Sequence, residues 1–246
     1  ATVAGIGCSS RFPYFVQAHG AHYIHGRALP FATGIAVSRQ DLDVFVFCGD
    51  GDAFSIGGNH FNHCARKNVN LTYCVMDNNV YGLTKKQTSP TSPIGFKSKT
   101  DMWGAIDKPI NPMQQAISAG ATFVARTTHT NPKHLLSMME AAMDHKGFAF
   151  IECLSECTEF YDGAFDSSNP RKGGEFKEIP EDHDPTDENA AYALAEELVP
   201  GYFGVYYQIS RPTKQDKEAE VNSKFLEKTK GMEDWEILQQ NFNKMK

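Results

Sequence analysis

The sequence contains no stretch of about 18 consecutive apolar residues, so it predicts no membrane-spanning helix. Its first residues, from Ala1 to Cys8, lack the basic leader and long apolar stretch of a signal peptide. Six cysteines in 246 residues are also too few for a secreted disulfide scaffold. We therefore expect a cytoplasmic protein that has no membrane partner.

An excess of positive charge is lacking too, because 24 Lys and Arg stand against 30 Asp and Glu, for a formal net charge of −6. Nucleic-acid binding requires Lys and Arg clustered on one face, so a nucleic-acid partner is disfavoured. No Gly-x-x-x-x-Gly-Lys-Ser/Thr motif and no Gly-x-Gly-x-x-Gly motif follows a predicted strand. This absence argues against a P-loop or dinucleotide-binding protein.

What the sequence does contain is an alternation of short apolar runs with helical patterns, in a composition typical of soluble globular proteins. The alternation predicts an α/β fold, with a mostly parallel sheet covered by helices on both faces. The predicted strands are 44–48, 71–76, 121–125 and 148–154, and the predicted helices are 29–38, 56–66, 113–119 and one that begins near Asn131.

The pattern divides the chain into two parts. Residues 1–165 hold the alternation, and we predict that they form one domain. Residues 166–246 are more polar, with a helix at 188–198 and a charged segment at 214–246, and we expect this C-terminal extension to pack on a partner subunit. Within the first part, residues 84–112 form a long loop rich in Thr, Ser, Pro and Lys, and such loops are usually functional.

Unusual polar residues follow two of the predicted strands. Gly49-Asp50-Gly51-Asp52 follows the first strand, and Asp77-Asn78-Asn79 follows the second. Each motif alone is explained by a tight turn. Because ligands of parallel α/β sheets bind beyond the carboxyl ends of strands, however, we expect Asp50 and Asn78 to lie close together. A carboxylate and an amide oxygen suit Mg²⁺, which prefers to share its ligands with phosphate groups. Glycines beside Asp50 let the backbone approach a phosphate, and the next helix offers its positive end.

These motifs resemble the thiamine diphosphate fingerprint, and a wider set of segments resembles the β subunit of 2-oxoacid:ferredoxin oxidoreductases, most strongly the 2-oxoglutarate members. The resemblance covers roughly residues 1 to 165. It implies the thiamine diphosphate-binding fold. The segments that carry it are His25-Gly-Arg-Ala-Leu-Pro, Gly49-Asp-Gly-Asp, Gly57-Gly-Asn-His-Phe and Met76-Asp-Asn-Asn-Val-Tyr-Gly-Leu-Thr-Lys85.

The resemblance also implies a role for individual residues. It assigns Mg²⁺ to Asp50, Asn78 and the backbone oxygen of Val80. Arg11 and Lys85 match basic positions that meet the carboxylates of the 2-oxoacid. A dianionic substrate in a partly desolvated pocket needs such charge-assisted hydrogen bonds. These two and His25 are the predicted catalytic residues. The predicted cofactor-binding residues are Gly7, Ser9, His25, Gly49, Asp50, Gly51, Asp52, Ala53, Asn78, Val80, Tyr81, Gly82, Leu83 and Thr84.

Four cysteines of the family's β subunit hold a [4Fe-4S] cluster, and Cys8 and Cys157 match two of them. From spacing alone, two cysteines this far apart in the sequence are interpreted as thiols buried in the core. The family's early Cys-x-x-Cys pair is expected upstream of Ala1, so we expect this chain to be a segment of a longer one. Glu156 stands where a proline commonly precedes the family's last cysteine, which places a carboxylate near the expected cluster.

The implied reaction is a coenzyme A-dependent oxidative decarboxylation of a 2-oxoacid, with 2-oxoglutarate to succinyl-CoA as the expected case. Electrons would pass through the cluster to ferredoxin. A partner α subunit, or α and γ subunits, would supply the aminopyrimidine-binding half and the activating glutamate in an (αβ)₂ assembly, so this chain alone is expected to be inactive. The alternatives are another 2-oxoacid such as pyruvate, a non-redox thiamine diphosphate decarboxylase or synthase, and a structural subunit without cofactor.

Overall fold

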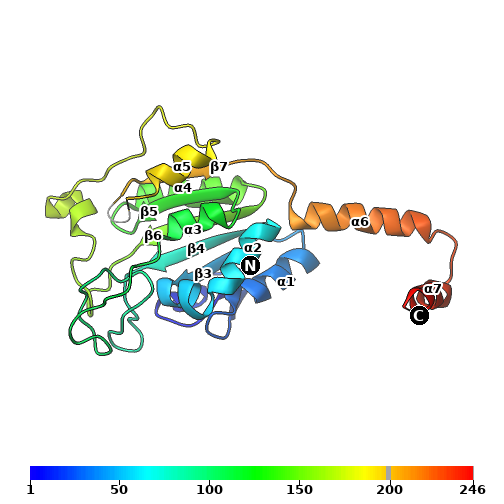
Figure 1. Cartoon of the computed structure of the whole chain (residues 1–246), viewed down its shortest axis with the longest axis horizontal. Coiled ribbons are helices and arrows are strands. Elements are labelled where there is room, and N and C mark those ends of the chain that lie inside the picture. The colour runs from blue at the N-terminus through cyan, green and yellow to red at the C-terminus, as the bar shows by residue number, and fades with distance from the viewer. Residues whose placement is uncertain (198–200, 246) are drawn as a thin grey trace.

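The structure is a computed structural model that describes residues 1–197 and 201–245. Seven strands form a single sheet in the order β2-β1-β3-β4-β6-β5-β7. Figure 1 labels the strands from β3 to β7. Every neighbouring pair is parallel except β5 and β7, which are antiparallel. The prediction of a mostly parallel α/β fold is therefore confirmed. The strands are β1 (Thr2–Ala4), β2 (Gly20–His22), β3 (Phe45–Gly49), β4 (Leu71–Asp77), β5 (Phe123–Thr128), β6 (Phe148–Leu154) and β7 (Gly204–Gln208).

Helices cover both faces of the sheet because its central strands are apolar on both sides. Every residue of β5 and β6 is buried, as expected for parallel strands between two helical layers. One core packs under α1 (Ala28–Ser38), α2 (Gly58–Lys67), α3 (Pro112–Ser118) and α5 (Glu188–Leu194). A second core on the opposite face packs under α4 (Pro132–Asp144) and the short helix η1 (Ser9–Tyr14).

Several predicted elements are confirmed, and the shifts have physical causes. The strand predicted at 148–154 is β6. The strand predicted at 121–125 lies at 123–128, because its last three residues are polar yet fully buried. The helix predicted from residue 56 is preceded by a π-helical segment, η2 (Gly51–Ile56). At the junction, a Cβ atom on Gly57 would lie 2.3 Å from the carbonyl oxygen of Asp52, so the tight turn requires glycine.

The C-terminal region contributes more to the sheet than its polarity suggests. The edge strand β7, which the sequence did not predict, lies beyond residue 165 and pairs with β5. The helix predicted at 188–198 ends at Leu194, and residue 198 lies outside the described residues. Two 3₁₀ turns, η3 (Asp166–Ser168) and η4 (Pro170–Lys172), precede this part. The sheet therefore continues past the predicted domain boundary.

Two further helices, α6 (Lys214–Lys228) and α7 (Asp234–Lys244), follow β7 and lead away from the sheet (Figure 1). Only a charged segment was expected there. Over the described part of the chain, no helix combines the length and the apolar character needed to span a membrane.

Candidate cofactor site

The ends of β3 and β4 meet at one edge of the sheet, as predicted. Gly49 pairs with Met76 in the parallel register, so Asp50 and Asp77 follow at the same level. The hydroxyl oxygen of Thr91 lies 2.9 Å from Oδ2 of Asp50 and 2.8 Å from Oδ1 of Asp77. Thr91 comes from the long loop at 84–112 and was not predicted as a site residue. It joins the two strand ends directly.

The electrostatics of this edge favour a cation. Asp50 and Asp77 are 2% and 1% exposed. Burial raises the pKa of Asp50 to about 6. Burial, together with the charges of Asp50 and Glu152, raises the pKa of Asp77 well above its usual value. The single hydroxyl proton of Thr91 can serve only one of the two carboxylates at a time. A divalent cation beside Asp50 would favour its charged form.

A cavity of about 160 Å³ opens at this edge. Asp50, Asn78 and Val80, the three predicted Mg²⁺ ligands, all line it. Ile6, which was not predicted, is also part of the wall. The other predicted residues in the wall are Gly7, Cys8, Ser9, His25, Gly49, Gly51, Asp52, Tyr81, Gly82, Leu83 and Thr84.

Close packing between the start of η2 and the turn after β4 shapes the cavity. The ring of Tyr81 lies on Gly51, where a Cβ atom would be 2.1 Å from Cε1, and its hydroxyl donates to the carbonyl oxygen of Gly51 at 3.3 Å. Oδ1 of Asn78 accepts from the backbone N–H of Val80 at 3.1 Å, and Asn79 has a positive φ of 56°. A tight polar turn with a glycine opposite is the kind of wall that a diphosphate and its cation require. The residues present therefore fit both groups.

Four predicted residues lie outside the cavity wall. Ala53 is buried in the hydrophobic core. Arg11 is exposed, with its guanidinium 5.3 Å from the centre of the Tyr14 ring. Lys85 is exposed immediately after Thr84, with a positive φ of 72°. Cys157 is the fourth. The roles of these residues stay predictions.

Cys8 and Cys157 come together although 149 positions of sequence separate them. A Cβ atom built on Gly82 would lie 3.7 Å from Sγ of Cys8 and 3.4 Å from Sγ of Cys157, so both sulfur atoms border the same point. Partial burial and the neighbouring Cys157 raise the pKa of Cys8. Within residues 1–197 and 201–245, no group of three or more His, Cys, Asp and Glu side chains has the arrangement of a metal site. The four other cysteines are buried free thiols.

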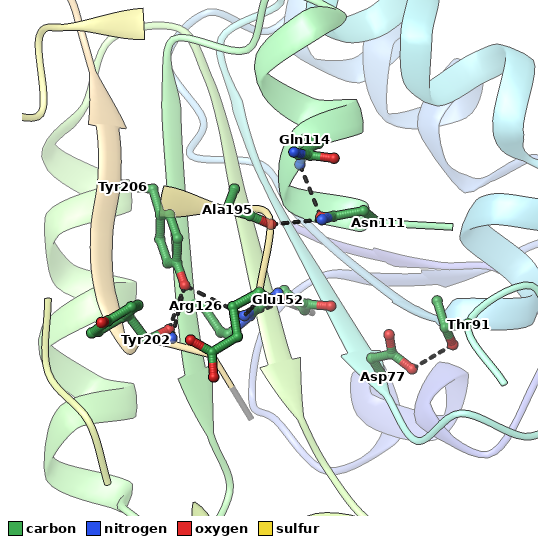
Figure 2. A network of polar contacts seen from close by, with 10 residues as sticks. Asp77, Thr91, Asn111, Gln114, Arg126, Glu152, Ala195, Tyr202 and Tyr206 are labelled. Atoms are coloured by element: carbon green, nitrogen blue, oxygen red, sulfur yellow. Dashed lines mark hydrogen bonds and ion pairs between the residues drawn. The ribbon is translucent and has the colours of Figure 1, made fainter. Parts of the chain in front are cut away.

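A buried ion pair lies next to the strand ends. Arg126 on β5 is fully buried, and its Nε donates to Oε2 of Glu152 on β6 at 2.6 Å (Figure 2). Nη1 donates to the carbonyl oxygen of Glu197 at 3.2 Å and to the hydroxyl of Tyr206 at 3.4 Å. Neither charge was predicted, because an Arg and a Glu on separate apolar strands give no local signal.

Strand register sets this pair beside the site. Arg126 and Glu152 are Cα partners, and Glu152 is in turn the partner of Val75, two residues before Asp77 on the same face. The charge of Glu152 contributes to the raised pKa of Asp77. A row of buried ionisable side chains therefore crosses β5, β6, β4 and the end of β3, where Asp50 stands.

Comparison with known proteins agrees with this geometry. Residues 5–153 match the thiamine pyrophosphate enzyme, C-terminal TPP binding domain family. The sheet, the paired strand ends and this match define the class: a thiamine diphosphate-binding domain.

Individual relatives narrow the class. The chain is 49% identical over 165 residues to the 2-oxoglutarate oxidoreductase subunit KorB of Mycobacterium tuberculosis, covering 67% of this chain and 44% of that protein. It is 47% identical to the 2-oxoglutarate synthase subunit KorB of Methanocaldococcus jannaschii, covering 68% of this chain and 61% of that one. It thus spans only about half of the length of these curated relatives.

A solved structure is also similar to this chain. It is a 2-oxoglutarate:ferredoxin oxidoreductase from Magnetococcus marinus with 2-oxoglutarate, coenzyme A and succinyl-CoA bound. The two chains superpose with a TM-score of 0.89 at 41% sequence identity, and the match covers 97% of this chain and 81% of that one.

The chain belongs to the family of 2-oxoacid:ferredoxin oxidoreductase β subunits.

Proposed function

We propose that this chain binds the diphosphate and Mg²⁺ of thiamine diphosphate as the β subunit of a cytoplasmic complex that oxidatively decarboxylates 2-oxoglutarate to succinyl-CoA. The observation that carries the proposal is the meeting of Asp50, Asn78 and Val80 at one cavity beyond two parallel strand ends. The Magnetococcus marinus relative, whose structure holds 2-oxoglutarate, coenzyme A and succinyl-CoA, supports the choice of substrate.

Each part of the cavity has a chemical task in this proposal. Asp50, Asn78 and the carbonyl oxygen of Val80 would hold the cation, and the backbone around Gly51 and Gly82 would approach the diphosphate. Thiamine diphosphate supplies an electron sink for decarboxylation when it is bound. Arg11 and Lys85, exposed outside the cavity wall, would offer positive charge to the two carboxylates of the substrate.

Cys8 and Cys157 would provide two ligands of a [4Fe-4S] cluster, because their sulfur atoms border the same point beside Gly82. The family resemblance assigns the two remaining ligands to a Cys-x-x-Cys pair, a motif that residues 1–246 do not contain. In this arrangement the cluster lies next to the cofactor cavity, whose wall includes Cys8 and Gly82, so electrons would have a short path towards ferredoxin.

Exposed apolar residues on helices α6 and α7 support the proposal that the chain binds a partner subunit. On α6, Val221, Phe225 and Leu226 are 64%, 46% and 67% exposed, and on α7, Trp235, Leu238 and Phe242 are 66%, 58% and 61% exposed. The three residues of α7 recur at helical spacing and form one apolar stripe. We propose that this arm, residues 214–245, docks on the partner chain that supplies the aminopyrimidine-binding half and the activating glutamate, in an (αβ)₂ assembly.

The function is tested on the assembled complex, purified without oxygen and supplied with 2-oxoglutarate and coenzyme A. We expect succinyl-CoA to form while a ferredoxin or viologen dye is reduced, and the visible absorption of the cluster to bleach. Pyruvate should support a rate at least about tenfold lower, because the basic positions match a second carboxylate. The isolated chain should be inactive.

The matched control for the cluster is the Cys8→Ser variant. It should still bind thiamine diphosphate and Mg²⁺ but should lack the visible absorption and the dye reduction. Release of an aldehyde by the wild-type complex, without any iron and without dye reduction, would instead identify a non-redox thiamine diphosphate decarboxylase and would contradict the proposal.

Docking of the arm is tested with the Leu238→Asp variant, because a charge in the middle of an apolar interface is strongly unfavourable. We expect the variant to lose co-purification with the partner chain while its own thermal unfolding is unchanged. Leu136→Asp is the matched control, since Leu136 on α4 is 59% exposed, similar to Leu238, and lies outside the arm. Equal effects of the two substitutions would contradict docking through the arm.

A further inference from the structure

One carboxylate oxygen joins three separate segments of the cavity wall. Oδ1 of Asp52 accepts from the backbone N–H of Ile6 at 3.0 Å and of Gly26 at 2.7 Å, and it lies 2.5 Å from Nδ1 of His25. Asp52 is 3% exposed and stands in η2, two residues after Asp50. The contacts of this oxygen are all with protein groups, and the resemblance had predicted Asp52 beside the diphosphate.

The hydrogen bonds decide which nitrogen of His25 carries a proton. Oδ1 of Asp52 already accepts two backbone N–H groups, so this oxygen acts as an acceptor. The contact with His25 must then be a donation from Nδ1–H. Nε2 is then the ring nitrogen that is available to contact a ligand. The side chain of His25 is 36% exposed and lines the cavity.

The other carboxylate oxygen of Asp52, Oδ2, has a different environment from Oδ1. Oδ2 is buried without a hydrogen-bond partner among the described residues. A Cβ atom on Gly5 would lie 2.1 Å from it, so Gly5 makes room for the carboxylate. Keeping a half-satisfied carboxylate in a buried position is unfavourable for folding. A contribution to folding stability therefore does not explain why a carboxylate stands at position 52.

We propose that Asp52 is a positioning residue that orients His25, so that Nδ1 donates to Asp52 while Nε2 donates to a diphosphate oxygen of thiamine diphosphate. The inference rests on the proposed function and deepens it. With both ring nitrogens donating, the imidazole would lie between two anions, the carboxylate of Asp52 and the diphosphate. Asp52 would thereby act on the cofactor only through His25, and its contacts to Ile6 and Gly26 would keep the surrounding wall in place.

A double-mutant cycle on the complete complex tests this, with the cofactor stripped and Mg²⁺–thiamine diphosphate titrated back in a calorimeter. The variants are Asp52→Asn, His25→Gln and the double substitution. Asparagine keeps an oxygen for the two backbone donors, so the wall should persist. We expect each single variant to bind about tenfold more weakly or worse, and the double variant to bind no more weakly than His25→Gln alone. Asp41→Asn, the same change in an exposed ion pair, should bind like the wild type.

The Gly5→Ala variant gives a second route that keeps the negative charge. Its methyl group must displace the carboxylate of Asp52 from His25, and we expect the same loss of affinity. Additive losses in the cycle, or unchanged binding in both Asp52→Asn and Gly5→Ala, would overturn the role of Asp52. Failure of the wild-type complex to bind thiamine diphosphate would instead overturn the proposed function itself.

Discussion

Replacing Arg126 by methionine should lower the free energy of unfolding by about 3–5 kcal/mol, the usual cost of removing one partner from a buried ion pair. Arg126 is fully buried and Glu152 is 1% exposed, so the remaining carboxylate would have no access to solvent. Glu152 would also lie uncompensated near Asp77, and the carbonyl oxygen of Glu197 would lose a donor. Urea unfolding of the purified chain, followed by circular dichroism, measures the change.

Two controls separate the loss of the pair from the loss of volume. The double variant Arg126→Met, Glu152→Leu should recover most of the stability, because an apolar pair leaves no buried charge. Arg39→Met breaks an ion pair with two 2.7 Å hydrogen bonds to Asp41, but both side chains are largely exposed, and it should leave stability nearly unchanged. Equal effects of Arg126→Met and Arg39→Met would contradict the importance of burial.

The Asp50→Asn variant should lose the bound Mg²⁺ and thiamine diphosphate during purification of the complex. Removing one charged partner from a buried, hydrogen-bonded charge pair costs about 2–5 kcal/mol, which corresponds to a loss of roughly 30-fold or more in affinity. Metal analysis and a cofactor assay on the purified complex measure the loss. Asp144→Asn is the matched control, because Asp144 is exposed at the end of α4, outside the cavity wall.

The same substitution should have the opposite effect on the cofactor-free chain. Burial beside Asp77 makes the charged form of Asp50 unfavourable, and a neutral amide of the same shape removes this conflict. We expect the cofactor-free variant to unfold at a higher denaturant concentration than the wild type. Retention of the cofactor by a stable Asp50→Asn variant would refute the assignment of Asp50 as a metal ligand.

The sequence predicted those parts of the fold and site that depend on local signals. A buried strand, a crossover helix and a second parallel strand place the residues after the two strands at one edge, whatever the rest of the chain does. For this reason the two motifs alone are enough to predict that Asp50 and Asn78 lie together. Gly82, Leu83 and Thr84 were predicted from the family resemblance, and they line the same cavity as Asn78.

The parts that could not be predicted depend on contacts between distant segments. Thr91 reaches the strand ends from a loop without periodicity, and Arg126 meets Glu152 only through the register of β5 and β6. Asp52 could be placed near the site by its motif, but nothing local shows that its carboxylate faces Ile6 and Gly26. The apolar stripe of α7 was not predicted, because the composition of this segment indicates only that it is charged.

The most direct test of the account is the position of the cation in the assembled complex. Crystals grown with thiamine diphosphate and with Mn²⁺ in place of Mg²⁺ allow the metal to be located by its anomalous scattering. We predict one peak bonded to the side-chain oxygens of Asp50 and Asn78 and to the carbonyl oxygen of Val80, with a diphosphate oxygen completing the contact. A cofactor bound in the complex with its metal held by other residues would contradict the account.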